Sequence, residues 1–274
     1  VKIQERYEED GFYLVETDYE LKRVKGSAVK VVLKVKEGQA VQVTEINIVG
    51  NEALSSEAIK AMMQTKEGGY FSFLTKSGQF KEELLEVDIQ RVQLFLLTEG
   101  YVEGRVERPR VSLSPDKRSM TYTLRVQEGQ RYKMGKVDIA IEGDDWLVEK
   151  GSLEQLLSLR TDDIFNWQIM QADSTQVGDV YRDLGYANTV VSHDTKLDRD
   201  AQTVDLTYRI QKGNLVYIRQ IVVQGNKSTR DKVIRREMKI SEGDLYGATK
   251  IKYSKARITS LGFFDKVEIT PKPT

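Results

Sequence analysis

The stretch ITSLGFFDK (residues 258–266) ends an apolar, helix-like run with a glycine followed by an aromatic residue. The same pattern recurs in EEDGFYLVE (8–16), LTEGYVEGR (97–105) and RDLGYANTV (182–190). Helices commonly end at a glycine because the backbone there takes a positive φ, and the next side chain can pack back on the helix. The recurrence therefore predicts the same helix-to-strand corner in each repeat, and each repeat spans roughly 80–90 residues.

Three of these corners are preceded by a stretch in which apolar and polar residues alternate before a glycine. The stretches are VTEINIVGNEALSSEAIKAMM (43–63), MGKVDIAIEGDDWLVEKGSLEQLL (134–157) and IRQIVVQGNKSTRDKVIRREM (218–238). Alternation with a period of two is typical of a half-buried strand, and a Gly-Asn or Gly-Asp pair favours a sharp turn. We therefore expect a strand, a turn and a short helix. The expected helix N-caps are Ser55 or Ser56, Ser152, and Ser228 or Thr229.

A second helix is expected between each short helix and its glycine-aromatic corner, because apolar residues recur there at helical spacing. These residues are Leu85, Ile89, Val92 and Leu96 in 79–99, and Val177, Val180, Tyr181 and Leu184 in 167–184. Gly100, Gly185 and Gly262 should end the three helices with positive φ. Two strands, within 102–130 and within 187–214, then complete the two middle repeats.

The order strand, helix, helix, strand, strand describes one small α+β domain with a three-stranded sheet and two helices on one face. Tandem copies of such a domain predict an elongated arm. The expected boundaries are 1–39 for a partial copy (second helix and last two strands), 40–130, 131–214, and 215–274 for a copy that lacks its final strand. The partial first copy should be the least stable part, because nothing in it replaces the strand and helix that would cover its core.

The composition of the 274 residues suits a row of small domains. Apolar residues make up 39% and charged residues 31%, a polar balance expected where surface is large relative to volume. The 42 basic and 42 acidic residues cancel, so the chain as a whole carries no electrostatic footprint for nucleic acid. Cysteine is absent, which excludes disulfides, thiol nucleophiles and cysteine metal sites.

This order of elements, with INIVGN before the first helix and GY or GFF after the second, resembles the POTRA domain, the polypeptide-transport-associated module. The last repeat most closely resembles the final POTRA domain of the BamA family of bacterial outer-membrane protein assembly factors. That family reads I-x-x-G-N-x-x-[ST]-x-x-x-V-[IL]-R-R-E, then E-G and L-G-F-F. The chain matches this pattern at Gly225, Asn226, Thr229, Val233, Ile234, Arg235, Arg236, Glu237, Glu242, Gly243, Leu261, Gly262, Phe263 and Phe264.

The resemblance covers the whole chain, as half of a second POTRA domain followed by a third, a fourth and most of a fifth. It implies a scaffold on the periplasmic side of the outer membrane. Such a scaffold would recruit outer-membrane lipoproteins, including one similar to BamD, and would guide unfolded outer-membrane protein precursors to the family's own C-terminal β-barrel. That barrel is not among these 274 residues.

The Arg-Arg-Glu motif is the first candidate site. From the sequence alone, Arg235, Arg236 and Glu237 form the charged face of a short helix, with Arg236 and Glu237 turned to water. The resemblance implies more, because in the BamA family the acidic residue of this motif contacts the BamD-like lipoprotein. Glu237 is that residue in this chain, and an interfacial charge pair is costly to break when one partner stays buried.

The strand after the second helix is the second candidate site, because this order of elements leaves it at a sheet edge. In the repeat 40–130 the segment is Arg105, Val106, Glu107, Arg108, Pro109, Arg110 and Val111. Proline favours an edge, since it cannot donate to a ladder, and charges there discourage indiscriminate pairing. An extended client segment could add to this edge by β-augmentation with little sequence demand. A merely solvated edge is the alternative.

No residue pattern supports catalysis, a cofactor or a metal. His193 stands beside Asp194 in an expected strand, without the context of a nucleophile, so a surface position is expected. The chain has no phosphate-binding loop and no glycine-rich dinucleotide motif. We therefore expect a protein that is not an enzyme and that works by binding and positioning.

Three alternatives remain open at this point. The first is the POTRA arm of a related transporter, such as a TamA-like or two-partner secretion protein, which would move one dedicated substrate. The second is an enzyme such as a cell-wall hydrolase, with a pocket around His193 or Trp167. The third is an adhesin-like repeat array with no affinity for periplasmic lipoproteins.

Overall fold

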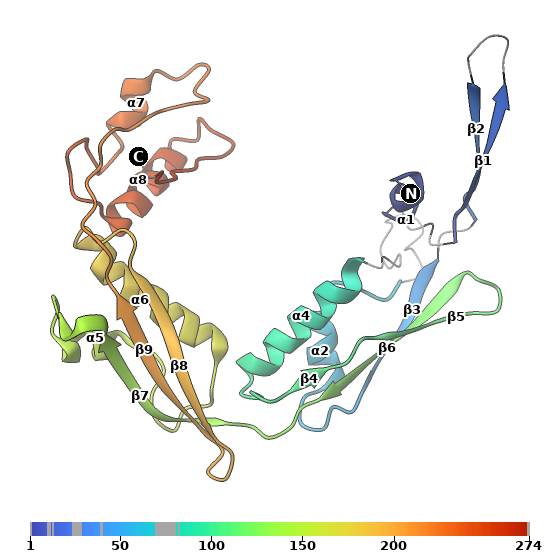
Figure 1. Cartoon of the computed structure of the whole chain (residues 1–274), viewed down its shortest axis with the longest axis horizontal. Coiled ribbons are helices and arrows are strands. Elements are labelled where there is room, and N and C mark those ends of the chain that lie inside the picture. Colours follow the sequence, from blue (N-terminus) through green and yellow to red (C-terminus); the bar gives the residue numbers. More distant parts are fainter. Residues whose placement is uncertain are drawn as a thin grey trace. The chain divides into compact units, whose positions relative to one another are not determined.

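A computed structural model describes residues 2–9, 12, 14–23, 29–38, 41–68, 81 and 83–272. The chain divides into two compact units, Val1–Tyr132 and Lys133–Thr274, and each is described by itself. Unit 1 contains α1 (Lys2–Glu9), β1 (Glu16–Arg23), β2 (Val29–Lys36), β3 (Gln42–Val49), α2 (Ser56–Met62), α4 (Glu83–Thr98), β4 (Arg105–Val106), β5 (Arg110–Leu113) and β6 (Ser119–Gln127) (Figure 1). Unit 2 contains β7 (Lys133–Ile141), the short 3-10 helix η1 (Glu142–Asp144), α5 (Lys150–Leu156), α6 (Trp167–Asp183), β8 (Val190–Asp198), β9 (Thr203–Gln211), α7 (Asp231–Arg235) and α8 (Ala248–Ser260).

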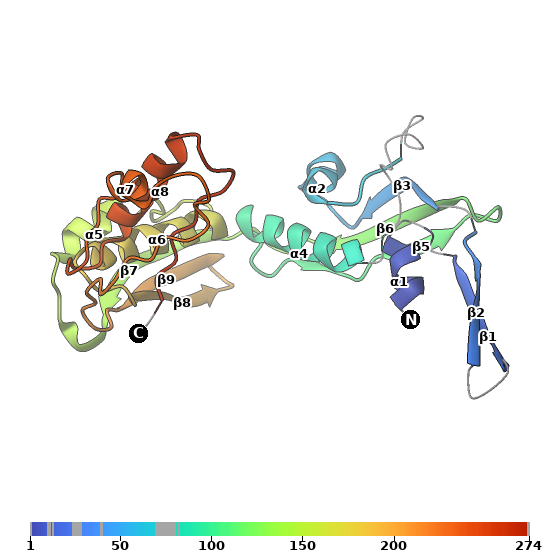
Figure 2. The same ribbon diagram turned by 90° about the horizontal axis from the view of Figure 1, so that it is seen from above.

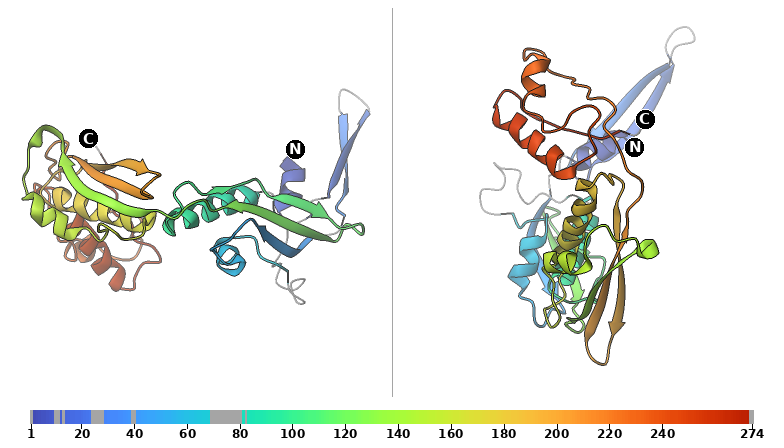
Figure 3. Two further views of the ribbon diagram at one scale, coloured as in Figure 1. Left: turned by 90° about the horizontal axis from the view of Figure 1, so that it is seen from below. Right: turned by 90° about the vertical axis from the view of Figure 1, so that its left-hand side faces the viewer.

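The last strand of the repeat in 41–132 runs through the middle of its sheet. β6 pairs in parallel with β3 on one side and antiparallel with β4 and β5 on the other, as the two views of Figure 3 allow the reader to follow. The turn after β3 depends on Gly50, whose φ is 84°. A Cβ on Gly50 would lie 2.4 Å from the carbonyl oxygen of Val126, so the turn passes directly over the central strand.

One face of this sheet is covered by helices. β6 alternates between buried and less buried side chains, as expected for a strand with one covered face. α4 contributes the predicted stripe, in which Leu85, Val92 and Leu96 are buried. The core consists of Val41, Val43, Ile46, Ile59, Met63, Leu85, Val92, Leu96, Tyr101, Met120, Tyr122, Leu124 and Val126.

Unit 2 repeats the plan in 133–214. The sheet order is β7-β9-β8, with β9 parallel to β7 and antiparallel to β8. Figure 2 shows α5 and α6 on one side of this sheet. The buried hydrophobic residues include Met134, Ile139, Leu153, Met170, Val177, Tyr181, Leu206, Tyr208 and Ile210. The expected α+β repeat with helices on one face is therefore present in both units.

The region 215–272 departs from the prediction. A strand was expected at 218–223, but only an isolated bridge between Tyr217 and Leu245 forms there. The physical reason lies in the sheet order of the other repeats: the central strand comes last, and no segment described in 215–272 takes its place. Phe263, expected to pack back on its helix, is 62% exposed for the same reason.

The helix C-termini were predicted correctly, but most of the predicted N-caps were not. Gly100, Gly185 and Gly262 have φ of 91°, 102° and 68°, as predicted. Ser55 caps α2 by accepting from the Ala58 N–H. The caps predicted at Ser152 and at Ser228 or Thr229 are wrong: α5 and α7 begin after Glu149 and Arg230, which make no side-chain cap bond. The corner at Gly11 lies outside the described residues.

The N-terminal region forms a hairpin of β1 and β2 beside α1. Cross-strand pairs such as Tyr19 with Leu33 and Leu21 with Val31 place apolar side chains on one face of the hairpin. That face is largely uncovered among the described residues, since Tyr19, Leu21 and Val31 are each more than 60% exposed.

Candidate partner-binding site

The predicted edge in unit 1 has the expected place in the sheet. β4 and β5 both pair with β6 and with no other described strand, so they form one edge. Arg105 and Arg110 are exposed, whereas Val106 and Val111 are half-buried. Glu107 accepts a hydrogen bond from Gln127 at 3.1 Å. The surface along this edge is therefore charged and exposed to solvent.

This edge is also interrupted. Arg108 and Pro109 lie between β4 and β5, and Pro109 is buried. β4 has two residues and β5 has four, so neither presents a long ladder. Pro109 has no N–H to offer a partner strand. A partner segment could add along β5 more readily than across the whole 105–111 stretch.

Unit 2 has a longer edge that the sequence prediction did not single out. β8 occupies the position equivalent to β4 and β5 and runs for nine residues, Val190–Asp198, without interruption. Val190 is 53% exposed, and Asp194 forms an ion pair with Arg209 of β9. The sequence did carry a signal, because the stretch VVSHDTKLD contains neither proline nor glycine.

The Arg-Arg-Glu motif lies at the end of α7, but its three side chains differ in exposure. The side chain of Arg236 is 65% exposed, whereas that of Glu237 is only 16% exposed. Glu237 Oε2 accepts from Arg257 of α8 at 2.7 Å and 3.1 Å, which pins α7 to α8. The expectation that Glu237 faces water is therefore wrong, because Arg257 covers it.

The charges around the motif are already paired within the repeat. The hydrogen bonds from Arg257 hold the pKa of Glu237 below its usual value, and Arg236 adds to this effect. Arg235 pairs with Asp231 at 2.8 Å and lies 3.5 Å from Glu242. A partner that binds Glu237 must therefore compete with Arg257 or contact both residues.

Buried polar residues in the second helix of each repeat serve the fold. Asp173 of α6 accepts from the backbone N–H groups of Ser158 and Leu159 at 2.8 Å and 3.0 Å, and from the hydroxyl of Tyr208. Burial and the Asp173 charge raise the pKa of Tyr208. Asp88 in α4 and Ser254 in α8 accept backbone N–H groups at the equivalent place. Through these hydrogen bonds, the second helix of each repeat binds the backbone of the segment that follows the first helix.

His193 is not the plain surface residue that was expected. It is half-buried, and its Nε2 contacts the Ser174 hydroxyl of α6. Its ring packs edge-on against Tyr208 with centroids 5.8 Å apart. Burial lowers the pKa of His193, which favours the neutral ring. The carboxylate of Asp173, the residue before Ser174, is bound to the backbone N–H groups of Ser158 and Leu159 and to the Tyr208 hydroxyl.

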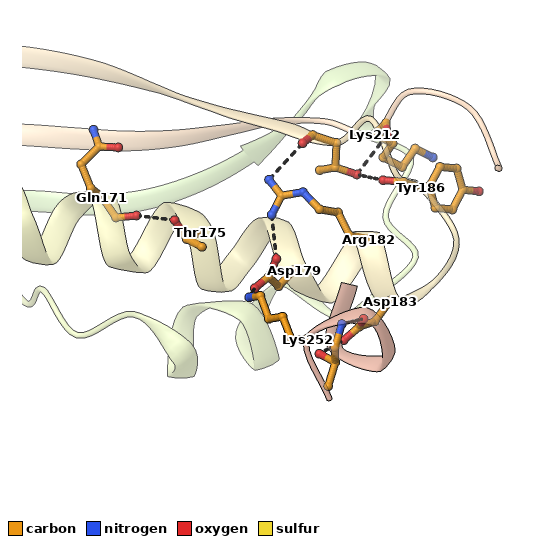
Figure 4. A network of polar contacts seen from close by, with 10 residues as sticks. Gln171, Thr175, Asp179, Arg182, Asp183, Tyr186, Lys212 and Lys252 are labelled. Carbon is orange, nitrogen blue, oxygen red and sulfur yellow. Dashed lines mark hydrogen bonds and ion pairs between the residues drawn. The ribbon is translucent and has the colours of Figure 1, made fainter. Parts of the chain in front are cut away.

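A polar network joins α6 to α8 within unit 2 (Figure 4). Asp183 accepts from the backbone N–H of Thr249 at 2.7 Å, at the start of α8. Asp179 pairs with Arg182 and with Lys252 of α8. An open hollow of about 550 Å³ beside this network is lined by Leu156, Ala172, Thr175, Gln176, Asp179, Val180, Asp183 and Thr249. The network holds the region 215–272 on α6 of the preceding repeat.

Within the described residues, no group of His, Asp and Glu could hold a metal ion. None of the described helices combines the length and apolarity needed to cross a bilayer. The surfaces considered for an interaction are the sheet edges at β5 and β8 and the α7–α8 face around Arg236.

A protein family model matches each of the three repeats. The POTRA family, described as a surface antigen variable number repeat, matches residues 41–129, 136–213 and 216–274. The chain is 32% identical over its whole length to the outer membrane protein assembly factor BamA of Nitratidesulfovibrio vulgaris. It is 30% identical over 99% of its length to BamA of Neisseria meningitidis serogroup B. In both cases it spans 34% of the relative, about a third of the length of these curated proteins.

A solved structure has the same fold. The crystal structure of Haemophilus influenzae BamA POTRA3-5 matches 83% of this chain and 88% of its own, with a TM-score of 0.69 and 24% identity.

Proposed function

The chain belongs to the POTRA family, and from that premise we propose that it is the POTRA region of an outer-membrane protein assembly factor. It acts there as a periplasmic scaffold that recruits lipoprotein partners and guides unfolded outer-membrane proteins to the barrel for folding and insertion. The observation that carries the proposal is the 32% and 30% identity to assembly factors over essentially the whole chain. The arm of a dedicated transporter would share the fold, but these relatives support the assembly factor.

The scaffold works by binding and positioning, not by catalysis. Support for this comes from the way its candidate groups are occupied: Asp173 is bound to backbone, and His193 is half-buried against α6. An unfolded β-barrel strand can instead bind through its main chain at an open sheet edge. The edges at β5 and β8 are the surfaces that suit it, and β8 offers the longer ladder.

An NMR titration tests the client edge. The probe is a synthetic peptide with the alternating apolar and polar pattern of an outer-membrane strand, and a scrambled peptide of equal composition is the control. We expect the amide signals of Val190–Asp198 and Arg110–Leu113 to shift, and those of β3 and β7 to stay in place. Shifts that are equal on both sides of the sheets, or absent with both peptides, would contradict the edge assignment.

We propose that the lipoprotein contact lies at Arg235, Arg236 and Glu237, as the resemblance to the BamA family implies. The internal pair between Glu237 and Arg257 complicates a simple reversal, because Glu237→Lys also breaks the link between α7 and α8. The decisive comparison therefore includes a second variant, Glu237→Lys/Arg257→Glu. This double variant keeps an ion pair between α7 and α8 but exchanges the positions of the two charges. Binding of a BamD-like lipoprotein to the parent and the two variants is measured by calorimetry.

Three outcomes are distinct. If Glu237 contacts the partner, both variants lose binding although the exchange variant keeps its fold. If Glu237 serves only to hold α7 on α8, the exchange variant binds like the parent. Equal binding by all three moves the lipoprotein contact away from this motif.

A further inference from the structure

The segment before the turn glycine of each repeat, a strand in β3 and β7 and an extended stretch at 218–223, has one backbone N–H that binds a carboxylate. The residue is an isoleucine at the same place before the turn glycine in all three repeats. The three bonds run from Ile46 N–H to Glu67 Oε1 (2.8 Å), from Ile139 N–H to Asp138 Oδ1 (2.8 Å), and from Ile221 N–H to Glu242 Oε1 (2.9 Å). We call Glu67, Asp138 and Glu242 the edge carboxylates.

Each edge carboxylate is paired with a cation of the first helix of its repeat. The pairs are Glu67 with Lys60 (2.9 Å), Asp138 with Lys150 (2.6 Å), and Glu242 with Arg235 (3.5 Å). The carboxylates come from different places in the chain, since Glu67 and Glu242 follow the first helix while Asp138 lies within the strand. Carboxylates at different sequence positions therefore make the same contact with the isoleucine N–H.

The contact lies on the outer side of the sheet. β3 and β7 each pair with the central strand on one side, so their other side is an edge. At its start this edge is already bonded to the chain, because Met134 of β7 bonds to Asp162 and Asp163 and Gly68 donates to Val43 of β3. A partner strand adds to an edge through outward N–H and C=O groups. At Ile221 both groups are already used, because Arg235 Nη2 donates to its carbonyl oxygen at 2.7 Å. The carboxylate and its cation thus take the place that a partner strand would occupy.

We propose that the edge carboxylates Glu67 and Asp138 block strand addition at β3 and β7, the first edges of the two formed sheets, so that a partner strand adds only at the opposite edge, β5 or β8. Displacing an edge carboxylate would leave an ion pair without its hydrogen bond and would desolvate charge against the incoming strand. The block itself stands without the proposed function, whereas the direction of a client strand to β5 or β8 rests on it.

The electrostatics favour a charged acceptor at this place. The hydrogen bond from Lys60 and that from Ile46 lower the pKa of Glu67. Lys136 and Lys150 lower the pKa of Asp138 to about 2. Both carboxylates are therefore ionised at neutral pH, where charge at an edge is most effective against pairing.

The test uses the double variant Glu67→Ala/Asp138→Ala, with one change in each unit. The matched control is Glu57→Ala/Glu149→Ala, which removes the same charge from exposed positions at the start of α2 and α5. Sedimentation velocity over a concentration series reports self-association, and amide exchange reports Ile46 and Ile139. We expect the double variant to self-associate at least about tenfold more tightly than the parent and the control.

The block is wrong if the double variant sediments like the parent while Ile46 and Ile139 exchange faster, because the edge would then be open and still unpaired. If the double variant loses its circular dichroism, Glu67→Gln/Asp138→Asn replaces it, since the amides keep the acceptor and remove the charge. Titration with the strand peptide separates the two proposals. New shifts along β3 and β7 only in the double variant support the block, whereas missing shifts along β5 and β8 in the parent count against the proposed function alone.

Discussion

The region 41–132 contains a formed sheet, whereas the described region 215–272 contains no strand. In the first, β6 lies between β3 and the β4–β5 edge, and all of them belong to one sheet. In the second, no described segment takes the central place, and the stretch equivalent to β3 pairs with no strand. Nevertheless α7, α8 and the bond from Ile221 to Glu242 are formed. The helical half of the repeat and the contact of Ile221 with Glu242 therefore form without a sheet.

Amide exchange should show the largest difference between the two regions. The amides of 218–223 lack ladder bonds to a central strand. Apart from those of Ile218 and Ile221, which bond to Asp244 and Glu242, we expect them to exchange at least about 100-fold faster than the ladder-bonded amides of 43–49 in β3. Exchange is followed residue by residue by NMR. The helix α8 is the internal control and should stay protected, because it is anchored on α6 through Asp183 and Thr249. Equal protection of 218–223 and 43–49 would contradict the claim that the first of these segments is not part of a sheet.

The turn glycines provide the next largest effect. Gly50 and Gly225 both have a φ of 84°, so alanine at either position costs about 1–2 kcal/mol of backbone strain. At Gly50 the added Cβ would also lie 2.4 Å from the Val126 carbonyl oxygen, whereas at Gly225 nothing lies within 4 Å. We expect Gly50→Ala to lower the unfolding free energy of its region by about 3 kcal/mol or more, and Gly225→Ala by about 1.

Local unfolding free energies from amide exchange measure both variants, because a chain of several domains does not unfold in one step. A Gly50→Ala that costs no more than Gly225→Ala would mean that β6 yields to the added methyl group. In that case the central strand would not be the rigid element of the repeat.

A smaller difference is expected at the buried polar position of the second helix. Asp173→Ala leaves the N–H groups of Ser158 and Leu159 and the Tyr208 hydroxyl without this acceptor, at a cost of about 3 kcal/mol. Ser254→Ala leaves one N–H, that of Lys239, at a cost of about 1 kcal/mol. Exchange of the α6 and α8 amides measures both. Asp173→Asn, which keeps an acceptor oxygen, is the control and should fall between them.

The comparison also explains what the sequence could predict. Periodicity and the recurring glycines predicted both helices of each repeat and the order of its elements along the chain, because these depend on local spacing. They failed at 218–223, where a correct strand pattern lacks the neighbour that turns it into a strand. They also failed at Glu237, because its partner Arg257 lies on another helix and no local pattern connects them. The edge carboxylates were missed for the same reason. Glu67 and Asp138 make the same kind of contact, but they stand at different places in their repeats, so no sequence pattern connects them.

The smallest expected effect is a pH dependence of the sheet of unit 2. Lys136 and Lys150 depress the pKa of Asp138 to about 2, below that of an unfolded aspartate. The ionised carboxylate therefore stabilises the fold above about pH 4, and this contribution is lost as the pH falls toward 2. With allowance for solvent screening, we expect about 1 kcal/mol. Protection of the β7 amides between pH 5 and 2.5 should decline less in Asp138→Asn than in the parent. An identical decline in both would show that Asp138 holds its place on the edge by geometry rather than by charge.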